Sequence, residues 1–133
     1  MSTRANIIIK DKYTTLYFYR HSDGHPEGTL PTLELFLEWL KKGKIRDNPS
    51  QAAGWLILIG AAEYNPGSDY AIKNAPKTIN WQPDEHTAFH PWKVGAYEPV
   101  SRLSMDADYH YIIDLDSRDI TVKQVDRTTF EQA

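Results

Sequence analysis

Segments in which apolar and polar residues alternate stand near both ends of this 133-residue chain, and they constrain its fold more than any other feature. The alternating segments cover residues 5–10, 13–20, 109–116 and 120–125. A repeat of two residues is typical of a β-strand with one buried face. The short polar connections Asp11-Lys12 and Ser117-Arg118 therefore predict two β-hairpins, one at each end of the chain.

Between the hairpins, the spacing of apolar residues changes to that of amphipathic helices. The first helical stripe consists of Leu33, Phe36, Leu37 and Leu40. Thr32 is a suitable N-cap for this helix, and Gly43 is a suitable residue to end it. The lysines around Gly43, which are Lys41, Lys42 and Lys44, are interpreted as charges that complement the dipole at the end of the helix.

A second helix is predicted to begin at Asn48-Pro49, because Asn is a favoured cap and Pro is favoured at the first helical position. It is expected to reach about Tyr64. Its buried stripe is predicted to be Ala52, Trp55, Leu56 and Ile59. Residues 65–104 lack a clear period, apart from a short strand expected near residues 78–82, and long irregular segments are often functional.

These elements together predict a single α+β domain over residues 1–133. Because the hairpin connections are short, the sheet is expected to be mainly antiparallel, with four or five strands. Both helices are expected to pack on one face of that sheet. The exposed edges of such hairpins pair readily with other strands, which favours a homodimer.

The charge and composition of the chain disfavour several classes of protein. The net charge is −3, which argues against binding to duplex nucleic acid, since that binding depends on neutralising phosphates. The absence of cysteine removes disulfides, thiol catalysis and cysteine-type zinc sites. The longest apolar run, residues 55–62, is far too short to span a membrane. We therefore expect a soluble, cytoplasmic protein, and no motif indicates a cofactor.

The densest group of polar, chemically capable side chains lies at the end of the second alternating segment. Residues 17–19 are all aromatic, and they lead directly into a turn. The charged and titratable residues of this turn are Arg20, His21, Asp23, His25 and Glu27. Core packing does not require these groups so close together, and turns at the ends of strands often display binding residues. This turn is therefore the first candidate for a functional site.

One interpretation of the turn is a metal site. The possible ligands, which stand at every second position, are His21, Asp23, His25 and Glu27. Imidazole and carboxylate groups suit zinc, manganese or iron. Gly24 and Pro26 are expected to break an extended backbone and scatter these side chains, so we predict no metal site. The simpler interpretation is a turn in which Asp23 accepts backbone N–H groups and Gly24 is left-handed.

A second interpretation is a site for a small anionic, nucleotide-like ligand. Arg4 and Arg20 stand at the two ends of the first hairpin, so antiparallel pairing brings them to the same end of the sheet. Their guanidinium groups would hold a phosphate or carboxylate. Tyr19 would stack on a base, and His21 and Asp23 would orient a ribose or a base. The same arginines could instead form ion pairs that only pin the loop.

The first third of the chain resembles a family of small phage, prophage and bacterial proteins for which no activity is established. The resemblance rests on Thr3-Arg4-Ala5 before the first hairpin and on Phe18-Tyr19-Arg20-His21-Ser22-Asp23-Gly24-His25-Pro26-Glu27-Gly28 before a leucine-rich helix. The segment at residues 108–114 looks similar as well. A phage or prophage setting implies an accessory role inside a bacterial host cell, such as interference with host defence.

Two other functions remain open from the sequence. One is an inhibitor that docks on a host defence complex, as an anti-CRISPR does, through aromatic anchors surrounded by polar residues. Those anchors would be Trp81, Phe89, Trp92 and Tyr97. The other is a nucleotide hydrolase that uses His21 and Asp23, although no nucleophile motif or phosphate-binding loop accompanies them. The sequence therefore favours a binding protein over an enzyme.

Overall fold

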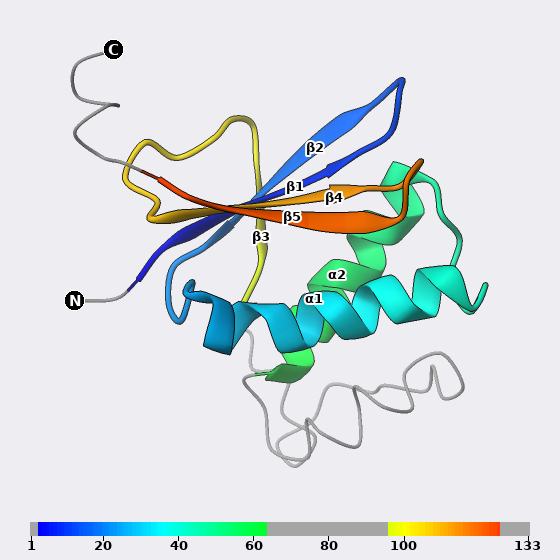
Figure 1. Ribbon diagram of the computed structural model, residues 1–133, viewed down its shortest axis with the longest axis horizontal. Helices are drawn as coiled ribbons and strands as arrows, with labels where there is room; N and C mark the ends of the chain where they lie inside the picture. The colour runs from blue at the N-terminus through cyan, green and yellow to red at the C-terminus, as the bar shows by residue number, and fades with distance from the viewer. Residues whose placement is uncertain (1–2, 64–95, 126–133) are drawn as a thin grey trace.

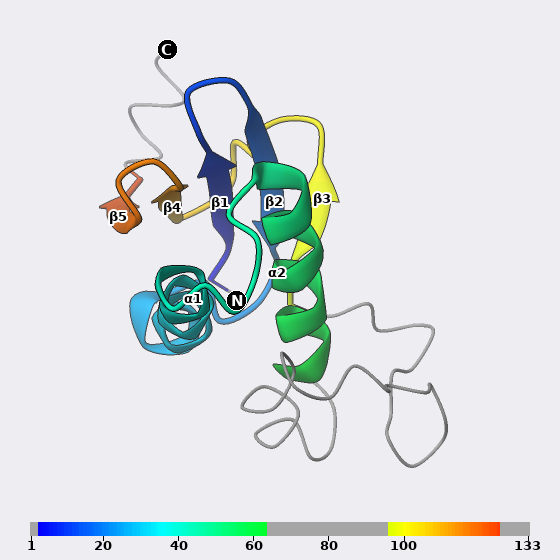
Figure 2. The same cartoon turned by 90° about the vertical axis from the view of Figure 1, so that its right-hand side faces the viewer.

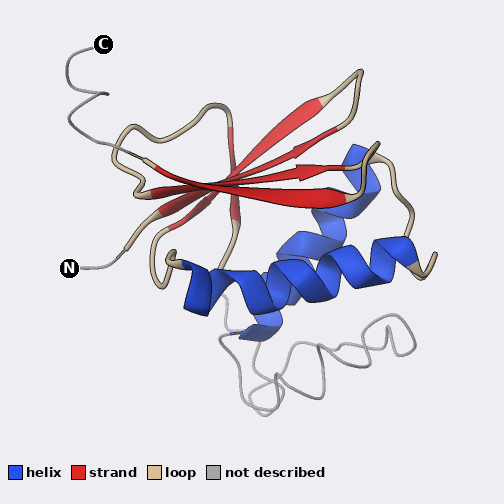
Figure 3. Cartoon of the chain, viewed as in Figure 1, coloured by secondary structure: helices blue, strands red, loops and turns tan. Residues whose placement is uncertain are grey.

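Two helices cover one face of a five-stranded sheet in the computed structural model, which describes residues 3–63 and 96–125 (Figures 1 and 3). In chain order, the elements are β1 (Ala5–Lys10), β2 (Thr15–Arg20), α1 (Pro26–Lys41), α2 (Pro49–Glu63), β3 (Glu98–Val100), β4 (Tyr109–Asp114) and β5 (Asp119–Gln124). This arrangement confirms the predicted α+β class and the mainly antiparallel sheet. Within the described residues, no helix combines the length and the apolar character needed to cross a membrane.

The strands lie in the order β3-β2-β1-β4-β5, with β1 at the centre of the sheet. The first hairpin pairs as the sequence predicts, with Ala5 opposite Arg20. On its other side, β1 pairs with β4 in parallel, with Ala5 beside Tyr109. The short hairpin connections gave no indication of a parallel pair. It arises because residues 101–108 carry the chain from β3, at one edge, to the far side of β1.

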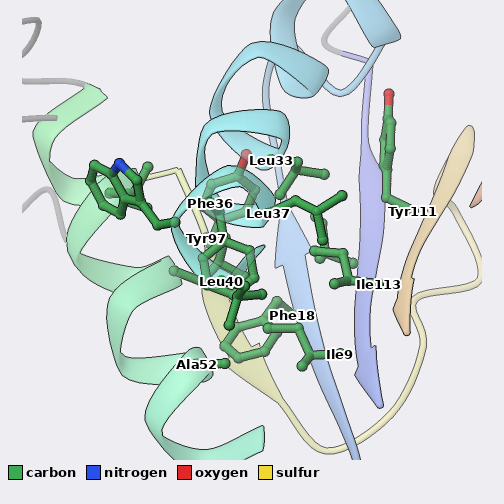
Figure 4. Close-up of a cluster of buried hydrophobic side chains, with 14 of the residues drawn as sticks. Ile9, Phe18, Leu33, Phe36, Leu37, Leu40, Ala52, Tyr97, Tyr111 and Ile113 are labelled. Carbon is green, nitrogen blue, oxygen red and sulfur yellow. The ribbon is translucent and has the colours of Figure 1, made fainter. Parts of the chain in front are cut away.

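Alternation along the strands divides the sheet into a face under the helices and an opposite face, here called the open face. Ile7 and Ile9 of β1 lie under the helices and are fully buried, next to Phe18 on β2 and Tyr111 on β4. Figure 4 shows this core between the strands and the helices. The helices contribute apolar side chains that include Leu33, Phe36, Leu40 and Ala52. The apolar stripes predicted for both helices therefore supply the core.

The two helices cover different parts of the sheet. Figure 2 shows α1 end-on on the side of β4 and β5, whereas α2 runs across the view on the side of β2. α2 contacts both β1 and β2. The helices therefore differ strongly in direction, and the connection between α1 and α2 turns the chain at one end of the sheet.

Helix α1 begins at Pro26, six residues before the predicted cap Thr32. Pro26 occupies the start of the helix, where its missing N–H needs no helical partner, and Glu27 places a negative charge in the first turn. These features outweigh the loss of one main-chain hydrogen bond at Pro31, which lies inside the helix. The end of the helix is as predicted, because Gly43 follows it with a left-handed φ of 69°.

The second helix and the last hairpin are close to their predicted positions. The side chain of Asn48 caps α2 by accepting the N–H of Gln51 at 2.9 Å. The turn between β4 and β5 contains residues 115–118, and is thus longer than the predicted Ser117-Arg118 turn. Strand β3 was not predicted from the sequence, and it pairs with β2 at one edge of the sheet. The strand expected near residues 78–82 lies outside the described residues.

The end of α2 packs closely on the segment before β3 through Gly60. The carbonyl of Gly60 accepts the N–H of Ala96 at 3.0 Å. A Cβ atom at position 60 would lie 2.6 Å from Cδ2 of Tyr97, so only glycine permits this approach. The Tyr97 ring is fully buried, and its hydroxyl lies 2.6 Å from that of Thr32. The contact therefore joins both helices to the entry of β3.

Two glycines of α2 provide a matched test of this packing. The Gly60→Ala substitution should lower the free energy of unfolding by about 2 kcal/mol, because the added methyl group overlaps the Tyr97 ring. The Gly54→Ala substitution should raise it by about 0.5–1 kcal/mol, because no atom lies within 4 Å and Ala is the better helix former. Urea denaturation measures both changes. A Gly60→Ala variant as stable as the wild type would contradict the packing.

Candidate functional site

Arg20, which the sequence predicted as a ligand contact, is buried under the helices with 1% of its surface exposed. Its Nε donates to the carbonyls of Ser22 at 2.8 Å and Asp23 at 3.2 Å, and its Nη2 donates to the carbonyl of Gly28 at 3.3 Å. The guanidinium also lies 5.2 Å from the centre of the Tyr97 ring, within cation–π range. A buried charge requires such partners to replace water. The prediction is therefore corrected, since Arg20 organises the turn from within.

Close backbone contacts hold the turn that follows Arg20. Asp23 is exposed at the surface and left-handed, with a φ of 56°, and its carbonyl accepts the hydroxyl of Thr29 at 2.8 Å. The sequence had predicted the left-handed residue at Gly24. Gly24 is required instead for close approach, because a Cβ there would lie 2.8 Å from the carbonyl carbon of Arg4. The carbonyl of Gly24 accepts the hydroxyl of Tyr111 at 2.6 Å, and burial raises the pKa of Tyr111 to about 12.

Arg4 lies at the same end of the sheet as Arg20, as the hairpin register predicts, but it has different partners. The Nη1 atom of Arg4 lies 2.5 Å from Oδ2 of Asp106, and the main-chain N–H of Arg4 donates to Oδ2 of Asp108 at 3.1 Å. The side chain is 33% exposed. Arg4 therefore carries an ion pair with the loop that precedes β4, which fastens this loop to the start of β1.

Tyr19 and His21 lie beside each other at this end of the sheet. Tyr19 is opposite Asn6 on the open face, and His21 follows the end of β2. The Tyr19 hydroxyl lies 3.0 Å from Nδ1 of His21. This nitrogen of His21 therefore faces a phenol hydroxyl, and the hydrolase interpretation stays a prediction.

The charge around Tyr19 is mainly negative. Burial raises the pKa of the phenol most, Asp106, Glu98 and Asp108 raise it further, and Arg4 lowers it. Three carboxylates and one guanidinium therefore act on this phenol, and their net negative charge disfavours an anionic ligand beside it. Nor do the described residues contain a group of three or more His, Asp or Glu side chains that could hold a metal ion. The anion site that the sequence predicted at this turn therefore lacks the positive charge that it would need.

The loop at residues 101–108 lies on the open face and is fastened there by Asn6, which is fully buried (Figure 1). Nδ2 of Asn6 donates to the carbonyl of Ser104 at 2.9 Å, and Oδ1 accepts the Ser104 N–H at 2.9 Å. This pair fixes the orientation of the amide, so Nδ2 is also the atom that lies 3.2 Å from Nε2 of His110. That nitrogen accepts only when the imidazole is neutral. Burial, and then Lys123, lowers the pKa of His110 and favours the neutral form.

A cleft of about 420 Å³ lies at the opposite end of the sheet, between the α1–α2 connection and the β4–β5 turn (right side of Figure 1). Its charged lining residues are Lys41, Lys44, Arg46, Asp47 and Arg118. Four cationic side chains thus accompany a single carboxylate, in a chain whose net charge is −3. We call this feature the basic cleft.

Arg118 connects the two walls of the basic cleft. Its Nη2 donates to Oδ2 of Asp47 at 2.9 Å, across 71 residues of sequence. Its backbone is left-handed, with a φ of 58°, a conformation that favours Gly or Asn and costs other residues about 1 kcal/mol. A left-handed residue is common at the end of a hairpin turn, and here it completes the turn between β4 and β5.

The basic cleft was not predicted, because Arg118 is distant in sequence from the three other cations that line the cleft. Lys41 and Lys44 were interpreted only as complements to the helix dipole, a role that Lys41 does have in the last turn of α1. Arg118 was assigned to a turn without a function. The positive charge of residues 41–46 was visible in the sequence, but the contact between Asp47 and Arg118 depends on the sheet order, which the sequence did not reveal.

The aromatic residues predicted for protein docking are not available as a described surface. Tyr97 is fully buried in the core, which corrects its assignment as a surface anchor. Trp81, Phe89 and Trp92 lie outside the described residues. The docking interpretation therefore has no described anchor.

No protein-family model, curated protein or solved structure matches this chain. The resemblance of its first third to phage and prophage proteins therefore stays a prediction.

The role of Arg20 can be tested with matched substitutions of two arginines. The Arg20→Leu variant should lose about 3 kcal/mol of unfolding free energy, because buried carbonyls lose a charged donor. The Arg46→Leu variant should change by less than about 0.5 kcal/mol, because Arg46 is exposed. Urea denaturation followed by circular dichroism provides the values. Equal stabilities of the two variants would show that Arg20 does not hold the turn.

His110 should make the stability of the protein depend on pH. Its pKa is lowered from 6.5 in the folded state, so the unfolded chain binds the proton more readily. The stabilisation is fully present above about pH 6.5, and it is lost as the pH falls through that value toward the folded-state pKa. The His110→Gln variant should lack this loss in urea denaturation between about pH 5 and pH 8. Parallel pH profiles for the wild type and the variant would contradict this role.

Proposed function

We propose that this protein binds a small ligand through phosphate or similar anionic groups, and that the basic cleft holds them. The observation that carries the proposal is the gathering of Lys41, Lys44, Arg46 and Arg118 around one cleft of about 420 Å³. Small-molecule sites commonly have volumes of roughly 300–1,000 Å³, so the cleft has a suitable size. The concentration of cations in an otherwise acidic chain supports an anionic ligand.

The side chains of the basic cleft offer two complementary ways to hold an anion. The lysines are mobile point charges, whereas an arginine presents a planar fork of donors that matches two oxygens of a phosphate. Arg118 already donates to Asp47, which fixes its position, and a guanidinium has five N–H donors in total. The described lining contains no aromatic side chain. Recognition there would therefore depend on the anionic groups rather than on stacking of a base.

This proposal retains the ligand class expected from the sequence and changes the residues that bind it. Arg20 is buried, and Arg4 is paired with Asp106 among further carboxylates, so neither supplies a free positive charge for a ligand. In the phage or prophage setting that the resemblance implies, such a protein would be an accessory factor. Sequestering a nucleotide-derived signal of the host's defence is the role that fits both the anionic ligand class and the phage or prophage setting.

The proposal predicts that the wild type binds inorganic pyrophosphate and ATP, and binds adenosine much more weakly. Replacing both Lys44 and Arg46 with Ser should weaken pyrophosphate binding by about tenfold or more, because two charged hydrogen-bond donors are removed. Replacing Lys12 and Arg102 with Ser removes the same charge from exposed positions outside the basic cleft, and should change binding less than about threefold. Isothermal titration calorimetry at low salt measures these affinities.

Three outcomes of this experiment would count against the basic cleft. The first is no pyrophosphate binding at millimolar concentration. The second is an equal loss of binding in the Lys44/Arg46 and Lys12/Arg102 variants, which would reduce the effect to net charge. The third is binding of adenosine as tight as that of ATP, which would place recognition on the base.

A further inference from the structure

Strand β5 is the last strand at one edge of the described sheet. It is six residues long, and five of its side chains are exposed while Ile120 is partly buried. In residues 3–63 and 96–125, no strand pairs with its outer side. The opposite edge is different, because β3 has three residues and contains Pro99, which lacks an N–H. Long edges without proline or a bulge are those that recruit another strand.

The hydrogen bonds of the last hairpin determine which backbone groups of β5 point outward. The N–H of Val125 donates to the carbonyl of Asp108 at 2.7 Å, so residue 125 points its N–H toward β4. Hydrogen-bonding direction alternates along an antiparallel pair with a continuous register. The N–H and carbonyl groups of Ile120, Val122 and Gln124 therefore point away from β4, toward the free edge.

We propose that two copies of this chain join through their β5 strands, antiparallel and around a two-fold axis at Thr121. In this register, Ile120 of each copy lies opposite Val122 of the other. Both residues have outward-pointing backbone groups, so the two such pairs would exchange about four main-chain hydrogen bonds. Their side chains are apolar and lie on the same face of the sheet, which adds a small hydrophobic contact across the axis. The outward-pointing backbone groups and the apolar side chains of β5 therefore favour the same register.

The charges of β5 are self-complementary in the same register. Asp119 of one copy lies opposite Lys123 of the other, and the symmetry repeats this pair on the second side of the axis. Centring the axis on residue 119 or 123 would place two like charges opposite each other, which is unfavourable. Within one copy, Asp119 is also opposite Asp114. A lysine from the second copy would offset this repulsion, so the dimer improves the local charge balance.

The dimer would form one continuous sheet with the helices of both copies on the same face. Arg118 precedes β5 directly, so the two basic clefts would lie roughly 20 Å apart along the strand direction. The pairing does not depend on ligand binding in those clefts, and it would hold if the proposed function proved wrong.

Sedimentation equilibrium of the full chain tests this pairing. The wild type should reach twice the monomer mass of 15.3 kDa as the concentration rises. The Val122→Pro variant should stay monomeric at the same concentrations, because it loses an outward N–H that the hairpin does not use. The Val122→Ala variant keeps that N–H and should still dimerise. Circular dichroism checks that each variant remains folded.

A charge exchange tests the register. The Lys123→Asp variant should weaken dimerisation by about tenfold, since Asp119 would meet a carboxylate twice across the axis. The double variant Asp119→Lys/Lys123→Asp should restore it, because opposite charges meet again. A wild type that is monomeric at every concentration, or a dimeric Val122→Pro variant, would overturn the β5 interface. Failure of the double variant to recover would overturn the register centred on Thr121.

Discussion

The buried guanidinium group of Arg20 is the interaction on which the rest of this structure depends. It lies between the Tyr97 ring and the carbonyls of the turn after β2, so one charge joins β2, the start of α1 and the segment before β3. A charge in that position is stable only while those groups surround it, which ties their positions together. The dense polar turn therefore owes much of its composition to folding. The exposure of His21 and Asp23 on this turn follows from the way in which Arg20 holds the turn.

Much of the fold followed from periodicity in the sequence, because strands and helices with one buried face repeat at different intervals. The parallel pairing of β1 with β4 did not, since it depends on where residues 101–108 carry the chain. The early start of α1 was missed because Pro26 suits a helix start as well as a loop. Strand β3 was missed because three residues carry too little pattern.

For the candidate site too, features set by neighbouring residues could be predicted, whereas contacts between distant segments could not. The hairpin register brought Arg4 and Arg20 to one end of the sheet, as predicted. The burial of Arg20 could also have been inferred, because it alternates in phase with Phe18 and therefore points to the core face. The basic cleft could not have been inferred, because Asp47 and Arg118 meet only after the sheet order is known.

The two ends of the sheet consequently differ in charge. At one end, Arg4 is surrounded by Asp106 and Asp108, and these groups fasten a loop over the open face. At the other end, Lys41, Lys44 and Arg46 line the basic cleft from one side, and Arg118 of the β4–β5 turn joins them through its bond to Asp47. The carboxylates at the first end disfavour an anion, so we propose the anion site at the second end. The proposed site therefore lies away from the turn that the sequence makes most conspicuous.

The most direct measurement is an NMR titration of the arginine Nε–H resonances with inorganic pyrophosphate. We expect the signals of Arg46 and Arg118 to shift, whereas the Arg20 signal should stay in place and its Nε–H should exchange slowly with solvent. A slow exchange is expected because that donor is buried and bonded to the carbonyl of Ser22. A shift of the Arg20 or Arg4 signal, with Arg46 and Arg118 unchanged, would contradict the account and return the ligand to the turn after β2.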